Sequence, residues 1–426
     1  MNTRKITISQ LSSGMFIHEL DIPWIKSPFL RHRRKIKSDN DISLMKKAGV
    51  KELYIDLSRG IDIQSDSPLN HEPPAEQLSN IDDPVDKVSQ ADSEASADEQ
   101  TLKNKNAQIV PLKEELKAAK VLQNKIGQLV KQLSQQVKQG QPISADSINP
   151  IIQEAVESIG RNDQALLTLL HLHRQDLKLN DHAFGVFSLI LPLAMKLSCS
   201  REEINELAMA ALLHDIGWAR LPMHLFDKKT PFSSAEKQLT QQHISIAENV
   251  LNKSNDFPDA VKVLVAQHHE FRNGSGYPGK LTSQNTHKLA EILQVTDAYD
   301  ELIHGLMGRQ GMLPASALQN IYQSAKKGLY SKTIVSEMIL VMGIFPLTSA
   351  VELSSGEKAL VVEIDKQKPL LPTVKIIYEA DGQACSSKKI INLAVQNEDE
   401  SIKIKKVIDP IDETSDPLGL LLVDSI

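Results

Sequence analysis

The sequence predicts a mainly α-helical protein with a small α+β module before the helices and a short β-rich extension after them. Apolar residues recur every three to four positions along 111–140 and through most of 148–345, which is the period of an α-helix. Residues 350–408 instead hold short runs of β-branched residues between turn residues, a pattern typical of strands. These two periods together predict a helical bundle flanked by small β-containing parts.

The first 60 residues are expected to form a small α+β regulatory module. Three short runs have the composition of strands: Ile6 to Ile8, Gly14 to His18 and Glu52 to Ile55. Asp41 to Ala48 has the spacing of a helix and ends before a turn at Gly49. One helix packed on a few strands would make a compact unit.

Residues 61–110 are predicted to be a disordered acidic linker. Between 61 and 100 the chain has eleven acidic residues, one lysine and few large apolar side chains. Such a segment cannot bury enough apolar surface to offset the entropy lost on ordering. The tail 409–426 is expected to be mobile.

Residues 111–140 are expected to form one long amphipathic helix. Pro111 suits a helix start and Gly140 a helix end. Its apolar positions, which keep the 3–4 spacing for more than three heptads, are Leu112, Leu116, Ala119, Leu122, Ile126, Leu129, Leu133 and Val137. Two interpretations remain open: the apolar face is the seam of a parallel homodimer, or it packs on its own domain.

Within 148–345 the helices are short and closely spaced. Ser233 to Glu236 is a capping box that opens one helix, and Pro258 suits the first turn of another. Beyond this domain, strands are predicted at Ala359 to Ile364, Thr373 to Tyr378 and Ile402 to Val407.

Composition excludes some classes of function. The formal charge of −6 gives no general attraction to nucleic acid or anionic lipid. No window approaches the roughly 20 apolar residues of a membrane span. The cysteines Cys199 and Cys385 cannot make a disulfide framework, so a cytoplasmic location is expected.

Histidine and aspartate residues gather at the ends and on the faces of predicted helices. His214-Asp215 ends an apolar run just before Ile216-Gly217, and His268-His269 ends another helix. Seven residues form this set: His182, His214, Asp215, His243, His268, His269 and Asp297. A mixture of imidazoles and carboxylates suits iron, manganese or zinc better than magnesium or calcium.

Five histidines and two aspartates are too many for one tetrahedral ion. They suffice for two ions with one bridging carboxylate. Two metal ions about 3.5–4 Å apart can clamp a phosphoryl oxygen and lower the pKa of a bridging water toward neutrality. The sequence therefore predicts a two-metal phosphodiester-hydrolase site between His182 and Asp297.

Two motifs, HDIG at 214–217 and HHEFRNGSGYPG at 268–279, resemble the HD-GYP domain, a branch of the HD phosphohydrolases. The family pattern is a helical bundle with HDIGK, a further histidine, HHExxDGxGYP and a DxxDA helix, and here the resemblance runs from about 170 to 345. It implies a cyclic di-GMP phosphodiesterase with two or three metal ions, often iron, that makes pGpG or GMP. Residues 1–60 also resemble the N-terminal module of unknown function that often precedes such domains.

The resemblance implies the same seven ligands, with Asp215 as the expected bridge and with Asp215 and His214 as the catalytic pair. Family members with three ions have a glutamate four residues before the first histidine, where this chain has Lys178. An ammonium group cannot bind a cation. Two divalent ions, iron or manganese, are therefore expected.

Other positions depart from the family pattern. The lysine of HDIGK is Trp218, and the arginine nine residues after the late aspartate is Leu306, whereas a basic residue three positions later survives as Arg309. The aspartate of DGxGYP is Asn273, which keeps an acceptor without the charge. The metal ligands are thus complete while the phosphate-binding residues are altered.

Substrate binding is therefore predicted for Arg309, Arg272 and Tyr277. Arg220, Lys228 and Lys229 are further candidates to replace the missing cations. In the family, the GYP loop is linked to contacts with GGDEF proteins, and Tyr277 could instead stack on a base.

Three functions compete. The first is hydrolysis of cyclic di-GMP, and the second, suggested by Trp218 and Leu306, is a signalling module that binds metal without useful turnover. The third is hydrolysis of another phosphodiester or nucleotide. Among the remaining polar residues, His171 is expected on the surface, and Asp300 is expected to orient its helix or a histidine outside the ligand set, and not to bind metal.

Overall fold

The computed structural model describes residues 3–20, 34–36, 42–43, 45–46, 49–57, 61, 110–172, 179–254, 256–365, 367–385, 389–396 and 402–408. The chain divides into two compact units, residues 1–105 and 106–426. The predicted tail and Lys178 lie outside the described residues, as does the predicted linker apart from its end positions 61 and 110.

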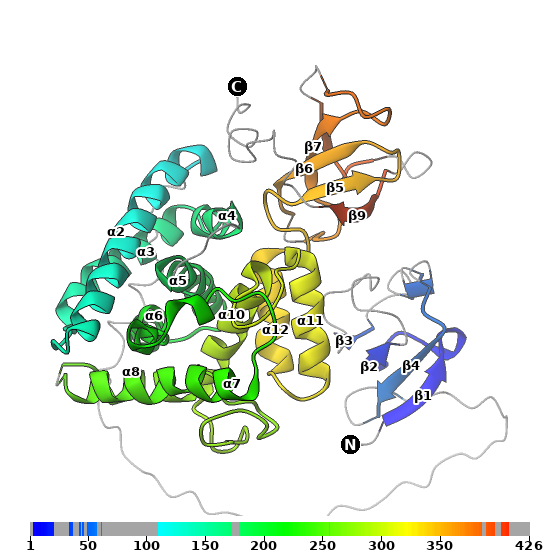
Figure 1. Cartoon of the computed structure of the whole chain (residues 1–426). Helices are drawn as coiled ribbons and strands as arrows, with labels where there is room; N and C mark the ends of the chain where they lie inside the picture. Colours follow the sequence, from blue (N-terminus) through cyan, green and yellow to red (C-terminus); the bar gives the residue numbers. More distant parts are fainter. Residues whose placement is uncertain are drawn as a thin grey trace, which may run out of the picture. The chain divides into compact units, whose positions relative to one another are not determined.

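The first unit contains a four-stranded antiparallel sheet in the order β1-β4-β2-β3 (Figure 1). Its strands are β1 (Thr3–Thr7), β2 (Phe16–Leu20), β3 (Arg34–Lys35) and β4 (Glu52–Asp56). Its core includes Ile6, Met15, Ile17, Ile36, Met45, Leu53 and Ile55. The predicted α+β character is confirmed, since residues 42–43 and 45–46 are helical.

The first strand lies earlier than the sequence suggested. Ile8 begins the 3-10 helix η1 (Ile8–Gln10) and is not part of β1. The reason is a local capping box, in which the Gln10 side chain accepts a hydrogen bond from the Thr7 backbone N–H at 3.0 Å. This bond turns the chain out of the sheet.

The second unit begins with a helical domain, which confirms the mainly α fold (Figure 1). Its helices are α2 (Leu112–Lys138), α3 (Asn149–Arg161), α4 (Ala165–Leu172), α5 (Leu179–Lys196), α6 (Arg201–Leu213), α7 (Ser234–Thr240), α8 (Gln242–Asn252), α9 (Asp259–Gln267), α10 (Lys288–His304), α11 (Pro314–Lys326) and α12 (Lys332–Met342). Short 3-10 helices are η3 (Ala145–Ser147), η4 (Ile216–Arg220) and η5 (Met223–Leu225). The capping box predicted at Ser233 is present at the start of α7, and Pro258 caps α9.

Helix α10 is the central helix of this domain. It packs against α5, α6, α9, α11 and α12, and every residue from Leu289 to His304 is buried. Its polar residues therefore have no access to water and must find partners inside the protein. Asp297, Asp300, Glu301 and His304 lie in this buried stretch, which makes α10 the frame of the site described below.

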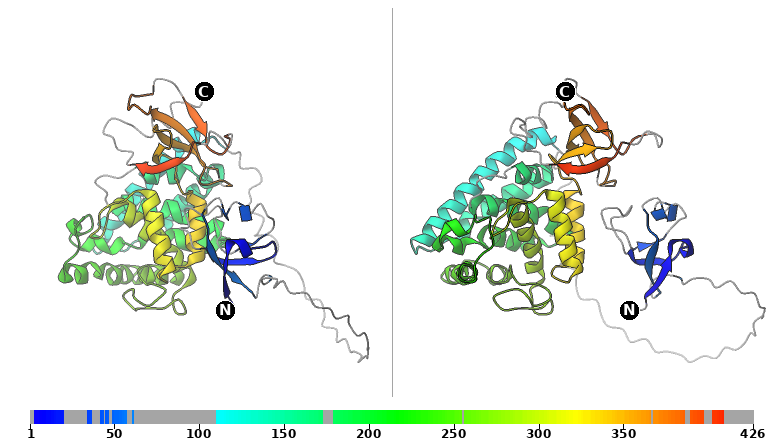
Figure 2. Two further views of the ribbon diagram at one scale, coloured as in Figure 1. Left: turned by 90° about the vertical axis from the view of Figure 1, so that its right-hand side faces the viewer. Right: turned by 45° about the vertical axis from the view of Figure 1, so that its right-hand side comes forward.

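Helix α2 packs on its own domain. Its apolar face contacts α3, α4, α5 and η4, and it runs along the outer side of the bundle in the views of Figures 1 and 2. Buried Glu115 binds Arg161 of α3, with Oε2 2.7 Å from Nε. Of the two interpretations left open for this helix, packing on its own domain is the one observed. A homodimer through 111–140 would have to use the polar face.

The chain after the helices forms a five-stranded antiparallel sheet in the order β8-β7-β6-β5-β9. The strands are β5 (Ala350–Leu353), β6 (Lys358–Glu363), β7 (Thr373–Tyr378), β8 (Ile390–Asn392) and β9 (Ile404–Ile408). The predicted β extension is thus confirmed. The structure also contains β5 and β8, which the sequence did not predict because strands of four and three residues are too short to show a clear alternation of apolar and polar residues. Across the described residues, no helix has the length and apolarity needed to cross a membrane.

Candidate metal centre

The seven predicted ligands converge in one buried region of the helical domain. His182 comes from α5, His214 and Asp215 follow α6, and His243 comes from α8. His268 and His269 follow α9, and Asp297 lies on α10. Their exposed fractions run from 0% to 9%, with His269 the most exposed. Residues on or directly after five helices thus meet in one buried region from which most water is excluded.

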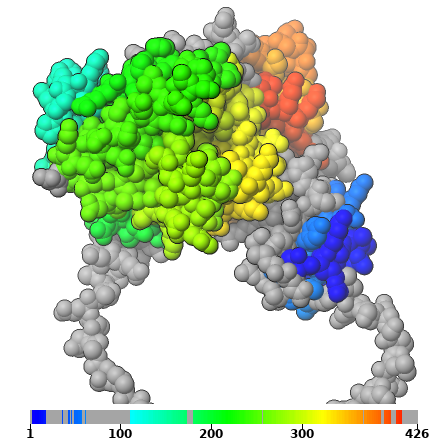
Figure 3. Space-filling view, turned by 60° about the horizontal axis from the view of Figure 1, so that its bottom comes forward, coloured from blue at the N-terminus to red at the C-terminus, as the bar shows by residue number. Residues whose placement is uncertain are grey.

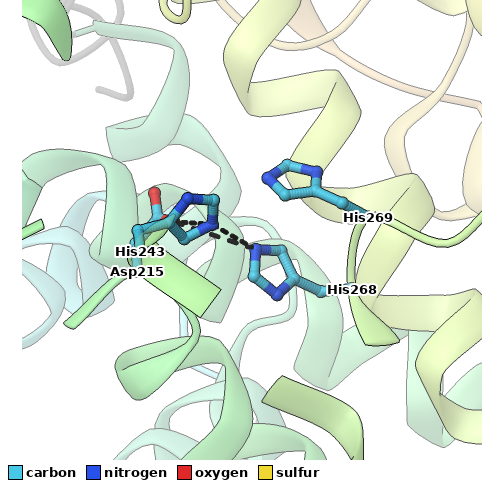
Figure 4. A group of neighbouring side chains, drawn as sticks. All are labelled: Asp215, His243, His268 and His269. Carbon is cyan, nitrogen blue, oxygen red and sulfur yellow. Dashed lines mark hydrogen bonds and ion pairs between the residues drawn. The ribbon is translucent and has the colours of Figure 1, made fainter. Parts of the chain in front are cut away.

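Asp215 lies between two pairs of histidines. Its Oδ2 is 3.5 Å from His182 Nε2 and 3.7 Å from His214 Nε2. Its Oδ1 is 3.4 Å from His243 Nε2 and 3.8 Å from His268 Nε2. Neither oxygen has a hydrogen-bond partner within the described part of the chain. Figure 4 shows Asp215 beside His243, with His268 and His269 across from them.

Three of the histidines have their protonation fixed by the backbone. In each of them, Nδ1 donates to the backbone carbonyl oxygen three residues earlier. The distances are 2.9 Å for His214, 2.6 Å for His243 and 2.7 Å for His268. A carbonyl oxygen can only accept, so each Nδ1 carries the proton and each Nε2 presents a lone pair. This arrangement is common for metal-binding histidines.

The Nε2 atoms of these histidines face one another in pairs. His182 Nε2 is 3.1 Å from His214 Nε2, and His243 Nε2 is 3.2 Å from His268 Nε2. His243 and His268 have lowered pKa values and are neutral, so their two lone pairs repel unless a cation lies against them, whereas in the other pair His182 carries a proton that an ion would replace. Together with the unpaired oxygens of Asp215, these contacts fit two divalent ions held on either side of one carboxylate.

Asp300 orients the first of these histidines, His182, which is itself a predicted ligand, whereas the sequence suggested a histidine outside the ligand set. Its Oδ2 accepts from His182 Nδ1 at 2.6 Å, while Asp297 Oδ1 is 3.1 Å from His182 Nε2. His304 Nδ1 lies 3.0 Å from the same Asp300 oxygen. Asp300 therefore directs the second nitrogen of His182 toward the cavity.

Burial keeps most of the imidazoles neutral. It lowers the pKa of His243, lowers that of His268 well below its usual range, and lowers that of His269 to about 3. Burial acts the same way on His182, but hydrogen bonds to Asp297 and Asp300 outweigh it and raise the pKa of His182 well above its usual range. A divalent ion would take the place of the proton that His182 shares with Asp297.

Two glycines let the elements of the centre approach each other closely. A Cβ at Gly217 would overlap the backbone carbonyl of His243, and a Cβ at Gly185 would overlap Asp300 Oδ1. The glycine of the HDIG motif is therefore required by the contact between η4 and α8.

Gly185→Ala is expected to weaken metal binding by displacing Asp300 from His182. Loss of such an orienting partner lowers metal affinity by about 10–100-fold, and overpacking costs about 1–3 kcal/mol. Manganese titration and urea unfolding would measure both effects. Gly160→Ala is the control, because nothing lies within 4 Å of a Cβ there, so it should stabilise helix α3 by about 0.5–1 kcal/mol. Equal metal affinity in the Gly185 variant and the wild type would contradict the role given to Asp300.

Trp218 and Leu306 form an apolar wall beside the metal centre. Both are 0% exposed, and they share a cluster with Leu179, Leu225 and Phe226. The indole of Trp218 stacks on His243, with ring centroids 5.7 Å apart and planes at 19°. The two positions where the family pattern has cations are thus adjacent in space, and both are apolar.

The three cationic residues considered as replacements at the phosphate-binding positions form contacts outside the metal centre. Arg220 Nε donates to the carbonyl of Val137 at 2.9 Å, and Lys228 pairs with Glu236 at 2.7 Å. Lys229 Nζ donates to the carbonyls that end α10, at 2.9 and 2.8 Å. These contacts tie the three side chains to structural partners outside the cluster of metal ligands.

The three predicted substrate-binding residues have different partners in the structure. Arg272 Nη1 is 2.5 Å from Glu291, whereas Arg309 Nη1 is 2.6 Å from Glu301 and has 47% of its side chain exposed. The ring of Tyr277 stacks on His269, with centroids 4.8 Å apart. Arg309 and Tyr277 therefore border the metal centre, while Arg272 is engaged with another carboxylate.

The loop that carries Tyr277 is built by hydrogen bonds within the loop. Glu270 accepts from the backbone N–H groups of Gly279 and Leu281, and Asn273 Oδ1 accepts from Ser275 Oγ at 2.7 Å. The amide at 273 thus retains the acceptor role expected of it. Residues from α7 through this loop form the face of the helical domain turned toward the viewer in Figure 3.

The sequence placed His171 wrongly on the surface and gave no role to Glu301. His171 was expected on the surface but is buried, with Nε2 2.9 Å from the hydroxyl of Tyr299, because α4 is buried along most of its length. Glu301 stands where the DxxDA pattern has alanine and was overlooked. Its position four residues after Asp297, on the same face of a helix, was the available signal.

Comparison with known proteins supports this picture. Residues 147–334 match the HD domain, residues 350–415 match a KOW domain associated with HD domain, and residues 3–148 match a domain of unknown function (DUF3391). This last match extends past the predicted 1–60 module to include α2.

This chain is similar to two curated proteins and to one solved structure. The chain is 24% identical over 391 residues to cyclic di-GMP phosphodiesterase PA4108 from Pseudomonas aeruginosa, covering 92% of this chain and 89% of that protein. It is 26% identical over 239 residues to cyclic di-GMP phosphodiesterase PdeB from Borreliella burgdorferi, covering 53% of this chain and 62% of PdeB. A solved structure, the HDG"Y"P protein Bd1817 from Bdellovibrio bacteriovorus, covers 79% of this chain and 98% of its own, at 17% identity and a TM-score of 0.47.

Proposed function

We propose that this chain, which belongs to the HD-domain family and carries the HD-GYP motifs, is a metal-dependent phosphodiesterase that hydrolyses cyclic di-GMP to pGpG or GMP. The observation that carries the proposal is the position of Asp215. Its two oxygens lie 3.4–3.8 Å from four histidine nitrogens and lack hydrogen-bond partners among the described residues.

The donor set supports two ions, iron or manganese. His182, His214 and Asp297 would hold one ion, and His243, His268 and His269 the other, with Asp215 bound to both. Such a pair supplies an activated water and positive charge against the phosphoryl oxygens. Four of the five histidines, all except His269, can bind through Nε2 because their Nδ1 protons are directed to carbonyl oxygens or to Asp300.

Arg309 and Tyr277 are proposed to bind the substrate. Arg309 is a half-exposed cation joined to the ligand cluster through Glu301, so it can reach a phosphate at the mouth of the cavity. Tyr277 already stacks on His269 and presents a ring suited to a base. Arg272 is the weaker candidate because its carboxylate partner, Glu291, is not part of the group of ligand atoms, whereas Glu301, the partner of Arg309, lies beside His269 and Asp297.

The test is a turnover assay on the purified chain loaded with iron(II) or manganese(II), with bound metal measured on the same sample. We expect cyclic di-GMP to be converted to pGpG or GMP, and other cyclic dinucleotides and linear nucleotides to react more slowly. Faster hydrolysis of another nucleotide would favour the third function considered from the sequence.

A second candidate function is favoured by the apolar wall of Trp218 and Leu306. A site that holds metal but has two apolar residues at the expected phosphate-binding positions could serve as a signalling module without useful turnover. A metal-loaded chain that leaves cyclic di-GMP intact over hours would support this second function over the first.

Three further predictions concern partners and location. The exposed residues of the GYP loop, Asn273, Ser275 and Pro278 among them, are proposed to contact GGDEF proteins. A homodimer and a cytoplasmic location stay predictions, the latter based on a content of two cysteines, which makes no disulfide framework.

A further inference from the structure

The carboxylate of Glu301 lies next to the metal centre without belonging to the expected set of ligands. Glu301 is 3% exposed, and it follows Asp297 by one helical turn on α10. His269, Asp297 and Glu301 each offer one ligand atom, and these three atoms all lie within 4.8 Å of one another.

The spacing of these atoms suits one cation. Ligands that share an ion at about 2.0–2.2 Å can be separated by at most about 4.4 Å. His269 Nδ1 is 3.7 Å from Asp297 Oδ2, and a small closure of the Glu301 carboxylate would complete the group. One imidazole and two carboxylates form a donor set suited to manganese or iron.

The charges around this group support an additional cation. Four buried carboxylates lie in this region: Asp215, Asp297, Asp300 and Glu301. Against these four carboxylates stand the guanidinium of Arg309, which donates to Oε2 of Glu301 and is half-exposed, and the imidazole of His182, which contacts Asp297 and Asp300. Burying several like charges without enough positive charge is costly, and divalent ions are the natural compensation.

A second observation points to a ligand at the same place. His269 Nε2 is buried, and among the described residues it has no hydrogen-bond partner. The other nitrogen of this ring faces Asp297. His269 therefore presents one ring nitrogen to each of two cation positions. Binding both cations requires the ring to lose its remaining N–H proton to solvent, which the positive charge of the two ions favours.

We propose that Glu301, with His269 and Asp297, binds a divalent cation in addition to the two ions of the centre proposed above. The inference rests on that proposed centre, because it shares two of its residues. It differs from the sequence-based expectation of two ions, which depended on the seven predicted ligands and on Lys178. Here the additional carboxylate comes from a different element, the central helix α10.

The test is a count of manganese ions bound per chain, by equilibrium dialysis and elemental analysis of the full-length protein. We expect three ions in the wild type and two in both Glu301→Gln and Glu301→Ala. The alanine variant removes every donor atom and restores the residue of the DxxDA pattern, so it should fold. The rise in Tm on adding manganese should also be smaller in both variants.

Two controls separate metal binding from ion pairing. Glu291→Gln changes another buried glutamate of α10 whose arginine partner, Arg272, lies at 2.5 Å, and it should keep three ions. Arg309→Gln removes the ion pair of Glu301 and leaves the carboxylate, so it should also keep three ions. Loss of an ion in Arg309→Gln equal to that in Glu301→Gln would assign Glu301 to the ion pair and overturn the inference.

Failure of the inference can be told apart from failure of the proposed function. A wild type that binds two ions, with two also in both Glu301 variants, overturns the additional site and leaves the two-ion centre intact. A wild type that binds no manganese or iron overturns both.

Discussion

Replacing Asp215 with alanine is expected to remove bound metal and lower hydrolysis of cyclic di-GMP by more than about 10³-fold. The reason is that its two oxygens serve both halves of the centre, at 3.4–3.8 Å from four histidine nitrogens. Loss of one such electrostatic contact costs about 10²–10³ in rate in other enzymes, and in the proposed centre one substitution would disturb both ions. His214→Ala should also lose metal and activity, since it removes a ligand of one ion.

The measurement is metal content and turnover on the same preparation of each variant, with circular dichroism to verify folding. Asp259→Ala is a matched control. This aspartate begins α9, has 94% of its side chain exposed and pairs with Lys262 on the surface, so metal and turnover should stay at wild-type values. Full turnover in Asp215→Ala or His214→Ala would refute the assigned site.

Restoring the family's cations at the apolar wall is expected to destabilise the protein strongly. Trp218→Lys replaces a fully buried indole with a charge that has no buried partner in the apolar cluster, and Leu306→Arg adds a second one. Loss of a buried tryptophan alone costs about 3–5 kcal/mol, and an unpaired buried charge adds to this. The double variant should therefore show a much lower free energy of unfolding by urea denaturation.

Trp218→Phe is the control for this experiment. It keeps an aromatic ring beside His243 and Phe226 and should cost only about 1–3 kcal/mol while leaving metal content unchanged. A folded Trp218→Lys, Leu306→Arg variant that gains hydrolysis, from a wild type that has none, would instead establish the signalling-module function. A double variant as stable as the wild type would show that the wall is not a packed core.

The sequence predicted most of the helical architecture for identifiable reasons. Helix starts at Ser233 and Pro111 follow from local hydrogen bonding and from the fixed φ of proline, and both are observed. The periodicity of α2 named seven of its buried residues, whereas Leu112 is only half-buried and the buried Glu115 and Val130 were not predicted. It did not choose between a dimer and a packed helix, because both bury the same face.

The limits of the sequence appear where polar residues are buried. His171 and Glu301 were assigned no role near the site because histidine and glutamate are most often exposed or structurally paired. Their burial depends on α4 and α10 being enclosed by other helices, and no local pattern reports that.

By itself, the sequence determined the fold class, the family and the seven candidate ligands, because helix periodicity and spaced motifs are local properties of the chain. Only the tertiary structure decided that the two oxygens of Asp215 face separate histidine pairs, that Trp218 and Leu306 join in one apolar wall, and that Glu301 lies beside His269. The physical reason is that these contacts join helices distant along the chain. Close packing around α10 sets which side chains meet, and hence where charge must be balanced.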